Sequence, residues 1–166
     1  QPSHPPLDKQ NQDLEKEMKK KIKSFKGKYE QKIPKYSSYK VKGKPMFHYA
    51  RKGVEVEDVK KNVEIKKVKV NSIYQITNTR LMKYIEKKIN SVKGDFRQAE
   101  SLMNWEKLLL DENKYYVLNV TLNVGSGTYI RAIADDFGRQ MEMGGLLLSL
   151  KRSKVGKFGI SSSVKV

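Results

Sequence analysis

The stretch "KYYVLNVTLNVGSGTYIRAIADDFG", residues 114–138, joins a strand pattern to a helix pattern through a glycine turn. Apolar residues occupy every second position from Tyr116 to Val124 in its first half, as in a half-buried β-strand. Its second half places apolar residues at helical spacing, namely Ile130, Ile133, Ala134 and Phe137. Gly125 and Gly127 permit a sharp turn between the two elements. The stretch therefore predicts a strand, a tight turn and a helix that buries one face.

Tyr129 and Arg131 stand where this helix begins. Free N–H groups at a helix start attract anions, and an arginine one turn in adds a bidentate donor for a phosphate or a carboxylate. Alternatively, Arg131 forms an i,i+4 ion pair with Asp135, the arrangement that the pattern alone favours. The role of Tyr129 is also open, because most tyrosines are half-buried with the hydroxyl at the surface. The glycine spacing matches neither the dinucleotide fingerprint nor a P-loop.

The charge of the chain indicates a polyanionic partner. Its 166 residues suffice for one domain, and 35 Lys and Arg stand against 18 Asp and Glu, a formal net charge of +17. Nucleic acid is the most frequent partner of such a chain, and an acidic membrane surface is a rarer one. A lysine-rich surface that serves only solvation is the alternative.

Several classes of site are excluded by what the sequence lacks. There is no cysteine, which excludes disulfides and thiolate metal sites, and His4 and His48 lie far apart without a metal-binding motif. We therefore expect no metal. No apolar run approaches the ~18–20 residues of a membrane span, and no signal peptide is present. These features predict a soluble, cytoplasmic protein without membrane contact, and the start at Gln1 predicts a piece of a longer protein.

The remaining patterns predict a mixed α+β fold with a mainly antiparallel sheet and flanking helices. After a frayed "QPSHPP", a helix over residues 8–25 carries one apolar stripe formed by Leu14, Met18, Ile22 and Phe25. "MFHYARKG", residues 46–53, predicts a short helix that ends at Gly53. Residues 63–76 alternate as a strand. Strands are too few for a repetitive βαβ array.

Residues 77–112 predict a helical hairpin. Thr77 or Thr79 caps the first helix, whose apolar stripe is Leu81, Ile85, Ile89 and Val92. The second helix supplies Leu102, Met103, Trp105 and Leu109, and we expect the stripe to pack against Leu102, Met103 and Leu109. Four basic side chains would then face outward, those of Arg80, Lys83, Lys87 and Lys88.

Three stretches in this order resemble the TruB-type tRNA pseudouridine synthases: "PKYSSYKVKGKPMFHYARKGVEVE" (34–57), "GTYIRAIADDFG" (127–138) and "LLLSLKRSKVGKF" (146–158). Ser38 stands where the family usually has alanine, and Ser153 where threonine is usual. The resemblance is specific over residues 25–57 and 121–160, and it does not cover residues 76–113, which look like an insertion. It implies a partial pseudouridine synthase catalytic domain that isomerises uridine to pseudouridine in the T-loop of tRNA, with no cofactor and no metal.

The resemblance also implies roles for individual residues. Tyr129 matches the tyrosine that stacks on the target base, and Arg131 matches the arginine that pairs with the catalytic aspartate. Leu150 matches a leucine of the base pocket. Lys40 and Tyr36 belong to the P-x-Y-S-A-x-K motif and are the remaining expected contacts to substrate. A flipped base needs an aromatic or apolar wall, and a reactive carboxylate needs an orienting cation, so the set is chemically coherent.

The family's nucleophile has no counterpart in the chain. It is the aspartate of a G-x-x-D-P-x-A-S-G motif, whereas none of the seven aspartates here is followed by proline. Asp135 and Asp136 match a helix position where the family's aspartate is structural. The resemblance thus implies the second half of a catalytic domain, inactive alone. Its expected partners are the T-arm of tRNA and the absent N-terminal half, and the family's C-terminal RNA-binding module is absent as well. A basic RNA-binding module without chemistry and a ribosome-associated protein are the alternatives.

Overall fold

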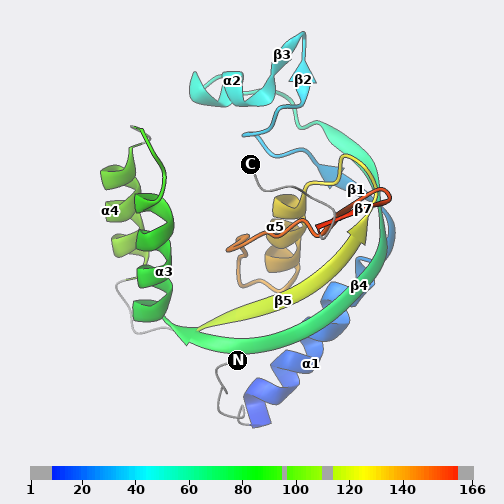
Figure 1. The fold of residues 1–166 in the computed structure, drawn as a ribbon, viewed down its shortest axis with the longest axis vertical. Helices are drawn as coiled ribbons and strands as arrows, with labels where there is room; N and C mark the ends of the chain where they lie inside the picture. The colour runs from blue at the N-terminus through cyan, green and yellow to red at the C-terminus, as the bar shows by residue number, and fades with distance from the viewer. Residues whose placement is uncertain (1–8, 95–96, 110–113, 161–166) are drawn as a thin grey trace. The chain divides into compact units, whose positions relative to one another are not determined.

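The computed structural model describes residues 9–94, 97–109 and 114–160 (Figure 1). In chain order the elements are α1 (Lys9–Ser24), β1 (Gly27–Lys32), β2 (Lys40–Val41), β3 (Lys44–Pro45), α2 (Met46–Arg51), β4 (Lys60–Thr77), α3 (Asn78–Asn90), α4 (Gln98–Leu108), β5 (Lys114–Val124), α5 (Ile130–Gln140), β6 (Lys154–Val155) and β7 (Phe158–Gly159). The expected frayed end at residues 1–6 lies outside the described residues.

A three-stranded sheet with the order β1-β4-β5 carries the fold. β1 pairs antiparallel with β4, with Gly27 opposite Ile65 and Lys32 opposite Lys60. The arrows of β4 and β5 point in opposite directions (Figure 1). The two short ladders, β2 with β3 and β6 with β7, are antiparallel too. The mixed α+β class with mainly antiparallel pairing is therefore confirmed.

The chain divides into two compact units, which we call the α3–α4 unit (Gln1–Lys19 and Lys67–Leu122) and the α5 unit (Lys20–Lys66 and Asn123–Val166). The boundary passes through α1, β4 and β5. Along β4 the burial alternation also changes phase there: Val63 and Ile65 are buried, whereas Val68 and Val70 are the half-buried residues that follow. Odd-numbered side chains are therefore the buried ones in the first part of β4, and even-numbered side chains are the less exposed ones directly after Lys66.

The α5 unit has the larger apolar core. Its buried apolar residues are Ile22, Phe25, Ile33, Met46, Val63, Ile65, Ala132, Ile133 and Met141. The stripe predicted for the first helix is confirmed, because Met18, Ile22 and Phe25 are buried and Leu14 is half-buried. β1 is an addition to the sequence prediction. Its buried inward residue is Gln31, a polar side chain that hides the usual strand pattern.

The α3–α4 unit contains the predicted hairpin. Thr77 rather than Thr79 caps α3, since its side chain accepts a hydrogen bond from the Arg80 N–H at 3.3 Å. Leu81, Ile85 and Leu109 are buried, as expected. The expected burial of Val92 and Met103 is wrong, because both side chains are exposed. The apolar residues of α4 are spread around the helix, so one contact face cannot cover Leu102 and Met103 together.

Candidate functional site

The turn between β5 and α5 is anchored to β4. The Gly125 N–H donates to the Glu64 carbonyl at 2.8 Å, and the Thr128 hydroxyl donates to the Gly125 carbonyl at 2.8 Å. Gly127 has a φ of +76°, which favours glycine, whereas Gly125 has an ordinary φ and space for a Cβ 3.5 Å from the nearest atom. Of the two glycines that we expected the turn to need, only Gly127 meets that requirement in its backbone.

Gln31 of β1 holds the backbone of Tyr129 at both polar groups. Its Oε1 accepts from the Tyr129 N–H at 2.8 Å, and its Nε2 donates to the Tyr129 carbonyl at 3.1 Å. Gln31 is 0% exposed, and its amide also donates to the Tyr29 hydroxyl. Tyr129 itself is half-buried, with the extended backbone of an N-cap and no side-chain cap bond. A buried amide that is fully paired fixes geometry, so the position of Tyr129 is set from β1.

Tyr29 links this amide to α5. The pKa of the Tyr29 hydroxyl is raised to about 12, mainly by burial, with the hydrogen bond from Gln31 acting to lower it and the negative charge of Asp136 acting to raise it. Phe25 packs edge-on against the Tyr29 ring, with 5.7 Å between the ring centroids. The Tyr29 hydroxyl therefore stays protonated at neutral pH.

Arg131 does not form the i,i+4 pair that the pattern favoured. Its Nη2 donates to the Tyr36 carbonyl at 2.7 Å, while Asp135 pairs with Arg139 at 3.1 Å and Asp136 pairs with Arg139 as well. An acidic residue four positions before a basic one is the better order on a helix, and a cation is favoured near the C-terminus, so Asp135 pairs with Arg139. Among the described residues no carboxylate lies within 4.0 Å of the Arg131 guanidinium.

A pocket of about 540 Å³ opens beside Arg131 within the α5 unit. Its lining residues are Lys32, Ile33, Pro34, Lys35, Arg131, Ala132, Asp135, Asp136, Arg139, Gly145, Leu146 and Leu147. Four of them are cationic and two are acidic, and both acids are paired with Arg139. Lys32 is paired with Asp58 at 2.5 Å. Arg131 keeps donors beyond the one bound to Tyr36, since a guanidinium carries five N–H groups, and can bind a carboxylate or a phosphate.

The other expected site residues lie at the surface. Tyr36 is 61% exposed and Leu150 is 57% exposed, and Lys40 is an exposed residue of β2. Tyr36 meets Arg131 only through its carbonyl. The structure thus joins Tyr36, Arg131 and Tyr129 to the same turn and helix, and it shows no bond between them and Lys40 or Leu150 in the described part of the chain.

The segment before α2 contains an unsatisfied group. Ser37 follows Tyr36 and is 5% exposed, and its hydroxyl has no hydrogen-bond partner among residues 9–94, 97–109 and 114–160. Its carbonyl accepts from the Phe47 N–H at 3.1 Å, which ties the segment to α2. Buried hydroxyls without a partner are rare in folded proteins and call for an explanation.

Sequence reasoning missed Gln31. Its signal is weak but present: in "GKYEQK" the residues Gly27, Tyr29 and Gln31 share one face of the strand, and lysines and a glutamate occupy the other. A glutamine in phase with an aromatic residue on an otherwise charged strand marks a buried polar contact.

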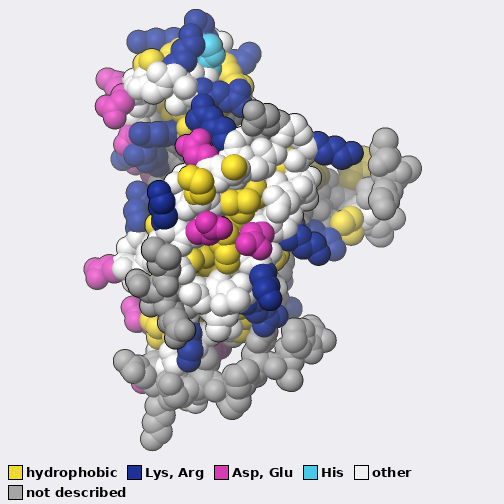
Figure 2. Space-filling view, turned by 90° about the vertical axis from the view of Figure 1, so that its left-hand side faces the viewer, with side chains coloured by type: hydrophobic (Ala, Val, Ile, Leu, Met, Phe, Trp, Pro, Cys, Tyr) yellow, Lys and Arg dark blue, Asp and Glu magenta, His cyan; other side chains and the backbone are white. Residues whose placement is uncertain are grey.

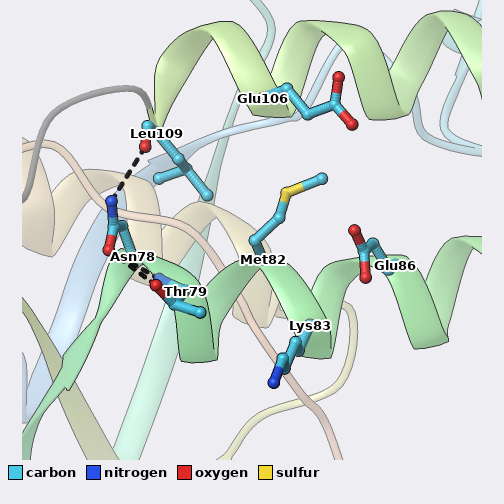
Figure 3. A pocket seen from close by; sticks show the side chains of 7 residues that line it. All are labelled: Asn78, Thr79, Met82, Lys83, Glu86, Glu106 and Leu109. Atoms are coloured by element: carbon cyan, nitrogen blue, oxygen red, sulfur yellow. Dashed lines mark hydrogen bonds between the residues drawn. The ribbon is translucent and has the colours of Figure 1, made fainter.

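A second pocket, of about 440 Å³, lies between α3 and α4 (Figure 3). Two of its lining residues are joined by a hydrogen bond, since the Asn78 side chain donates to the Leu109 carbonyl at 3.2 Å. The side chains of Glu86, Glu106 and Met82 turn towards the space between the helices, and Lys83 points away from both carboxylates (Figure 3). None of the expected site residues lines this pocket.

Among the described residues, no three His, Cys, Asp or Glu side chains come together as metal ligands, and no helix is long and apolar enough to cross a membrane. Lys and Arg side chains are spread over the face drawn in Figure 2, and Asp and Glu side chains lie near its middle beside hydrophobic ones. The formal net charge of +17, rather than this face alone, suits a polyanion.

Comparison with known proteins gives consistent matches. Residues 5–96 match the model of a family described as TruB family pseudouridylate synthase, N-terminal domain. The chain is 29% identical to tRNA pseudouridine synthase B of Clostridium tetani over 153 residues, 92% of this chain and 39% of the relative. It is 31% identical to the protein of the same name from Staphylococcus haemolyticus, over 86% of this chain and 35% of the relative. For Caldanaerobacter subterraneus the identity is 33%, over 86% of this chain and 36% of the relative.

The chain thus spans about two fifths or less of the length of these three curated relatives. The family match includes α1 to α3, and the longest of the three alignments covers nearly the whole chain.

Proposed function

Since the chain belongs to the TruB family of pseudouridylate synthases, we propose that it is the substrate-binding part of a tRNA pseudouridine synthase acting at position 55 in the T-loop. It is the later portion of the catalytic domain, with residues 77–112 as a helical insertion. The reaction moves the glycosidic bond of uridine from N1 to C5 of the uracil, so that no atom is gained or lost overall. The enzyme is cytoplasmic, and it uses the tRNA T-arm as its binding partner and no cofactor.

The observation that carries this proposal is the arrangement of Tyr129 and Arg131. Gln31 fixes the backbone of Tyr129 by two hydrogen bonds, which prepares the ring to stack on a flipped base. Arg131 lies two residues further along, exposed and with donors to spare. We assign Arg131 to the catalytic aspartate, which it would keep ionised and oriented.

Two groups that lack an expected partner support an incomplete site. Arg131 has no carboxylate partner and the Ser37 hydroxyl has no hydrogen-bond partner among the described residues. Both belong to stretches that resemble the family's motifs. We propose that a family-type segment outside residues 1–166 supplies the nucleophilic aspartate to Arg131. Leu150, Tyr36 and Lys40 then contact the substrate from the exposed surface.

The first test is reconstitution. The 166-residue chain alone should form no pseudouridine in a tRNA transcript, and it should become active when a family-type N-terminal half is fused before Gln1 or added in trans. Tritium release from C5-labelled uridine in the tRNA measures turnover. Activity of the chain alone would contradict the proposed source of the nucleophile and would point to Asp135 and Asp136. Tight tRNA binding with no reconstitution would favour the alternative, a basic RNA-binding module without chemistry.

In the reconstituted enzyme, Arg131→Ala should lower kcat by about 10²-fold or more, the usual cost of removing an electrostatic group that acts on the reacting centre. The affinity for tRNA should change little, because one charge is removed among 35. Arg139→Ala is the matched control, since it removes the same charge from the same helix but its partners are Asp135 and Asp136. Equal losses in the two variants would assign the effect to charge alone.

The role of Tyr129 is tested by two substitutions. Tyr129→Phe should retain most of the activity, whereas Tyr129→Ala should lose about 1–3 kcal/mol of stacking free energy. Single-turnover rates at saturating enzyme separate this loss from tRNA binding. Equal rates for the two variants would show that the ring does not stack on the base.

A further inference from the structure

Helix α3 carries a basic stripe, which we define as Arg80, Lys83, Lys87 and Lys88. These four cations stand against one acid on the helix, Glu86, so α3 has a net charge of +3. All four side chains are exposed, and no carboxylate pairs with any of them within 4.0 Å among the described residues. The stripe is therefore not neutralised inside the described part of the chain.

This charge arrangement is unfavourable in the first part of the helix. Arg80 and Lys83 are three residues apart and Lys83 and Lys87 are four apart, and like charges at these spacings destabilise a helix. Arg80 also lies in the first turn, where the helix dipole disfavours a cation. The helix dipole favours Lys87 and Lys88, which lie in the last turn, but local electrostatics does not account for Arg80 and Lys83. Residues that break a local rule often serve function.

α1 provides a comparison within the same chain. It is also rich in lysine, yet Lys16 pairs with Asp13 at 2.8 Å and Lys19 pairs with Glu15. Those pairs have i,i+3 and i,i+4 spacing, and α3 offers one comparable pair, Lys83 with Glu86 at i,i+3. Lys83 is three residues from Glu86 and points away from it (Figure 3). A lysine-rich helix of this protein can thus pair some of its lysines internally, and α3 does not pair its four cations.

The stripe lies on a helix that is both packed in the hairpin and capped. Leu81 and Ile85 are buried in the hairpin, whereas the side chains of the stripe are exposed, and Thr77 caps the first turn of α3. The Lys88 ammonium lies over the Tyr84 ring, 5.5 Å from its centroid, which places an aromatic residue among the cations. From Arg80 to Lys88 the helix rises about 12 Å, at about 1.5 Å per residue.

We propose that the basic stripe of α3 binds backbone phosphates of tRNA, as a contact surface separate from the residues around Tyr129 and Arg131. This inference rests on the proposed function for the identity of the RNA. Arg and Lys side chains are the groups that neutralise phosphates, and several in a row along a helix follow a strand of them. A membrane surface fits less well, because it would require an apolar face beside the cations, and the apolar residues Leu81 and Ile85 are buried.

The test compares two variants that lose the same charge. The stripe variant carries Arg80→Gln, Lys83→Gln, Lys87→Gln and Lys88→Gln. The control carries Lys67→Gln, Lys69→Gln, Lys107→Gln and Lys114→Gln, four exposed lysines from the same unit that lie on three different elements. The affinity of each 166-residue chain for a tRNA transcript is measured by fluorescence anisotropy over a range of salt concentrations.

For the stripe variant, the slope of log K against log salt should become shallower by about 3 units, at about 0.7–0.9 for each phosphate that the protein no longer neutralises. For the control, we expect a change of less than about 1 unit, because scattered lysines neutralise fewer phosphates at once. Equal changes in the two variants would overturn the proposed role of the stripe, because net charge alone would then account for the binding. An unchanged stripe variant would overturn it too. Wild-type chain that does not bind tRNA at low salt would instead contradict the proposed function.

Two further measurements distinguish phosphate binding by the stripe from a structural role and from membrane binding. Thermal unfolding should leave the Tm of the stripe variant close to that of the wild type, because glutamine is a good helix former and the relief of repulsion offsets the lost interaction of Lys87 and Lys88 with the end of the helix. A lower Tm would mean that the cations stabilise the hairpin internally, contrary to the proposal. Sedimentation with vesicles that contain phosphatidylserine tests the membrane. Loss of vesicle binding with unchanged tRNA binding would overturn the proposal.

Discussion

α3 and α5 each follow a strand of the same sheet, α3 directly after β4 and α5 after the turn at residues 125–129, but their starts are held in different ways. α3 is capped by Thr77, three residues from the N–H that it binds. α5 has no side-chain cap, and its first residue is preceded by Tyr129, whose backbone is held by Gln31, 98 positions away. The first start is encoded locally, and the second requires the tertiary fold. A helix start that depends on the tertiary fold can be placed relative to other groups, which is what a site needs.

The far end of α5 gives the largest expected effect. Gly138 is buried in the helix, and a Cβ there would overlap the backbone of Gly144 and Gly145. Gly138→Ala should therefore lower the free energy of unfolding by about 3 kcal/mol or more, since backbone cannot yield as a side chain does. Urea unfolding followed by circular dichroism measures the loss. Gly125→Ala is the control and should be tolerated, because its Cβ would lie 3.5 Å from the nearest atom.

Removing the hydrogen bonds between Gln31 and the backbone of Tyr129 should have the next largest effect. Gln31→Met keeps the volume but leaves the Tyr129 N–H without its acceptor, so the free energy of unfolding should fall by about 1–3 kcal/mol. Gln140→Met, at the exposed end of α5, is the matched control and should stay within about 0.5 kcal/mol of the wild type. In the reconstituted enzyme, Gln31→Met should lower kcat more than the affinity for tRNA. If Gln31→Met were as stable and as active as Gln140→Met, the start of α5 would not depend on the hydrogen bonds from Gln31.

The local cap of α3 should matter less. Thr77→Ala removes one hydrogen bond from the first turn, which costs about 1 kcal/mol, and the Arg80 N–H can turn to water. Thr79→Ala is the control, since Thr79 lies inside the helix. Urea unfolding compares the two. If Thr79→Ala destabilised the protein more, the cap would have been assigned to the wrong threonine.

The smallest effect concerns Tyr29 at high pH. Its pKa in the folded protein is about 12, above the ordinary 10.0, because burial disfavours the tyrosinate. A raised pKa means that the folded state holds this proton more tightly. The stabilisation is therefore complete below pH 10 and is lost as the pH rises from 10 towards 12.

Lysines also titrate in this range, so the measurement is the difference between wild type and Tyr29→Phe. The free energy of unfolding should fall more steeply with pH for the wild type. Parallel pH profiles would show that Tyr29 is not buried as described, and would weaken its link between Gln31 and Asp136.

Much of the fold could be predicted because its signals are local. The apolar stripe of α1, the alternation of β4 and β5 and the capping threonine of α3 are all read from neighbouring residues. β1 could not be predicted, because its buried position is occupied by Gln31 rather than an apolar residue. The exposed Val92 and Met103 were missed because periodicity does not say how much surface a partner helix can cover.

The candidate site divides in the same way. The glycine turn and the resemblance pointed to Tyr129 and Arg131. The contacts that hold them, from Gln31 and to the Tyr36 carbonyl, join residues 98 and 95 positions apart, and no spacing rule connects such distant residues. The pairing of Asp135 with Arg139 rather than with Arg131 was predictable from helix electrostatics. An acid that precedes the base by four residues is more favourable than the reverse order.

The hairpin has an evolutionary consequence that follows from where it leaves the sheet. Along the chain, α3 and α4 form the connection between β4 and β5, which are neighbouring strands in the sheet. Lengthening such a connection leaves the pairing of the strands unchanged and costs only about 0.6 kcal/mol for each doubling of its length. A lineage can therefore gain, enlarge or lose surface here without disturbing the turn that carries Tyr129. The same connection is a natural place for engineers to graft a different RNA-binding element.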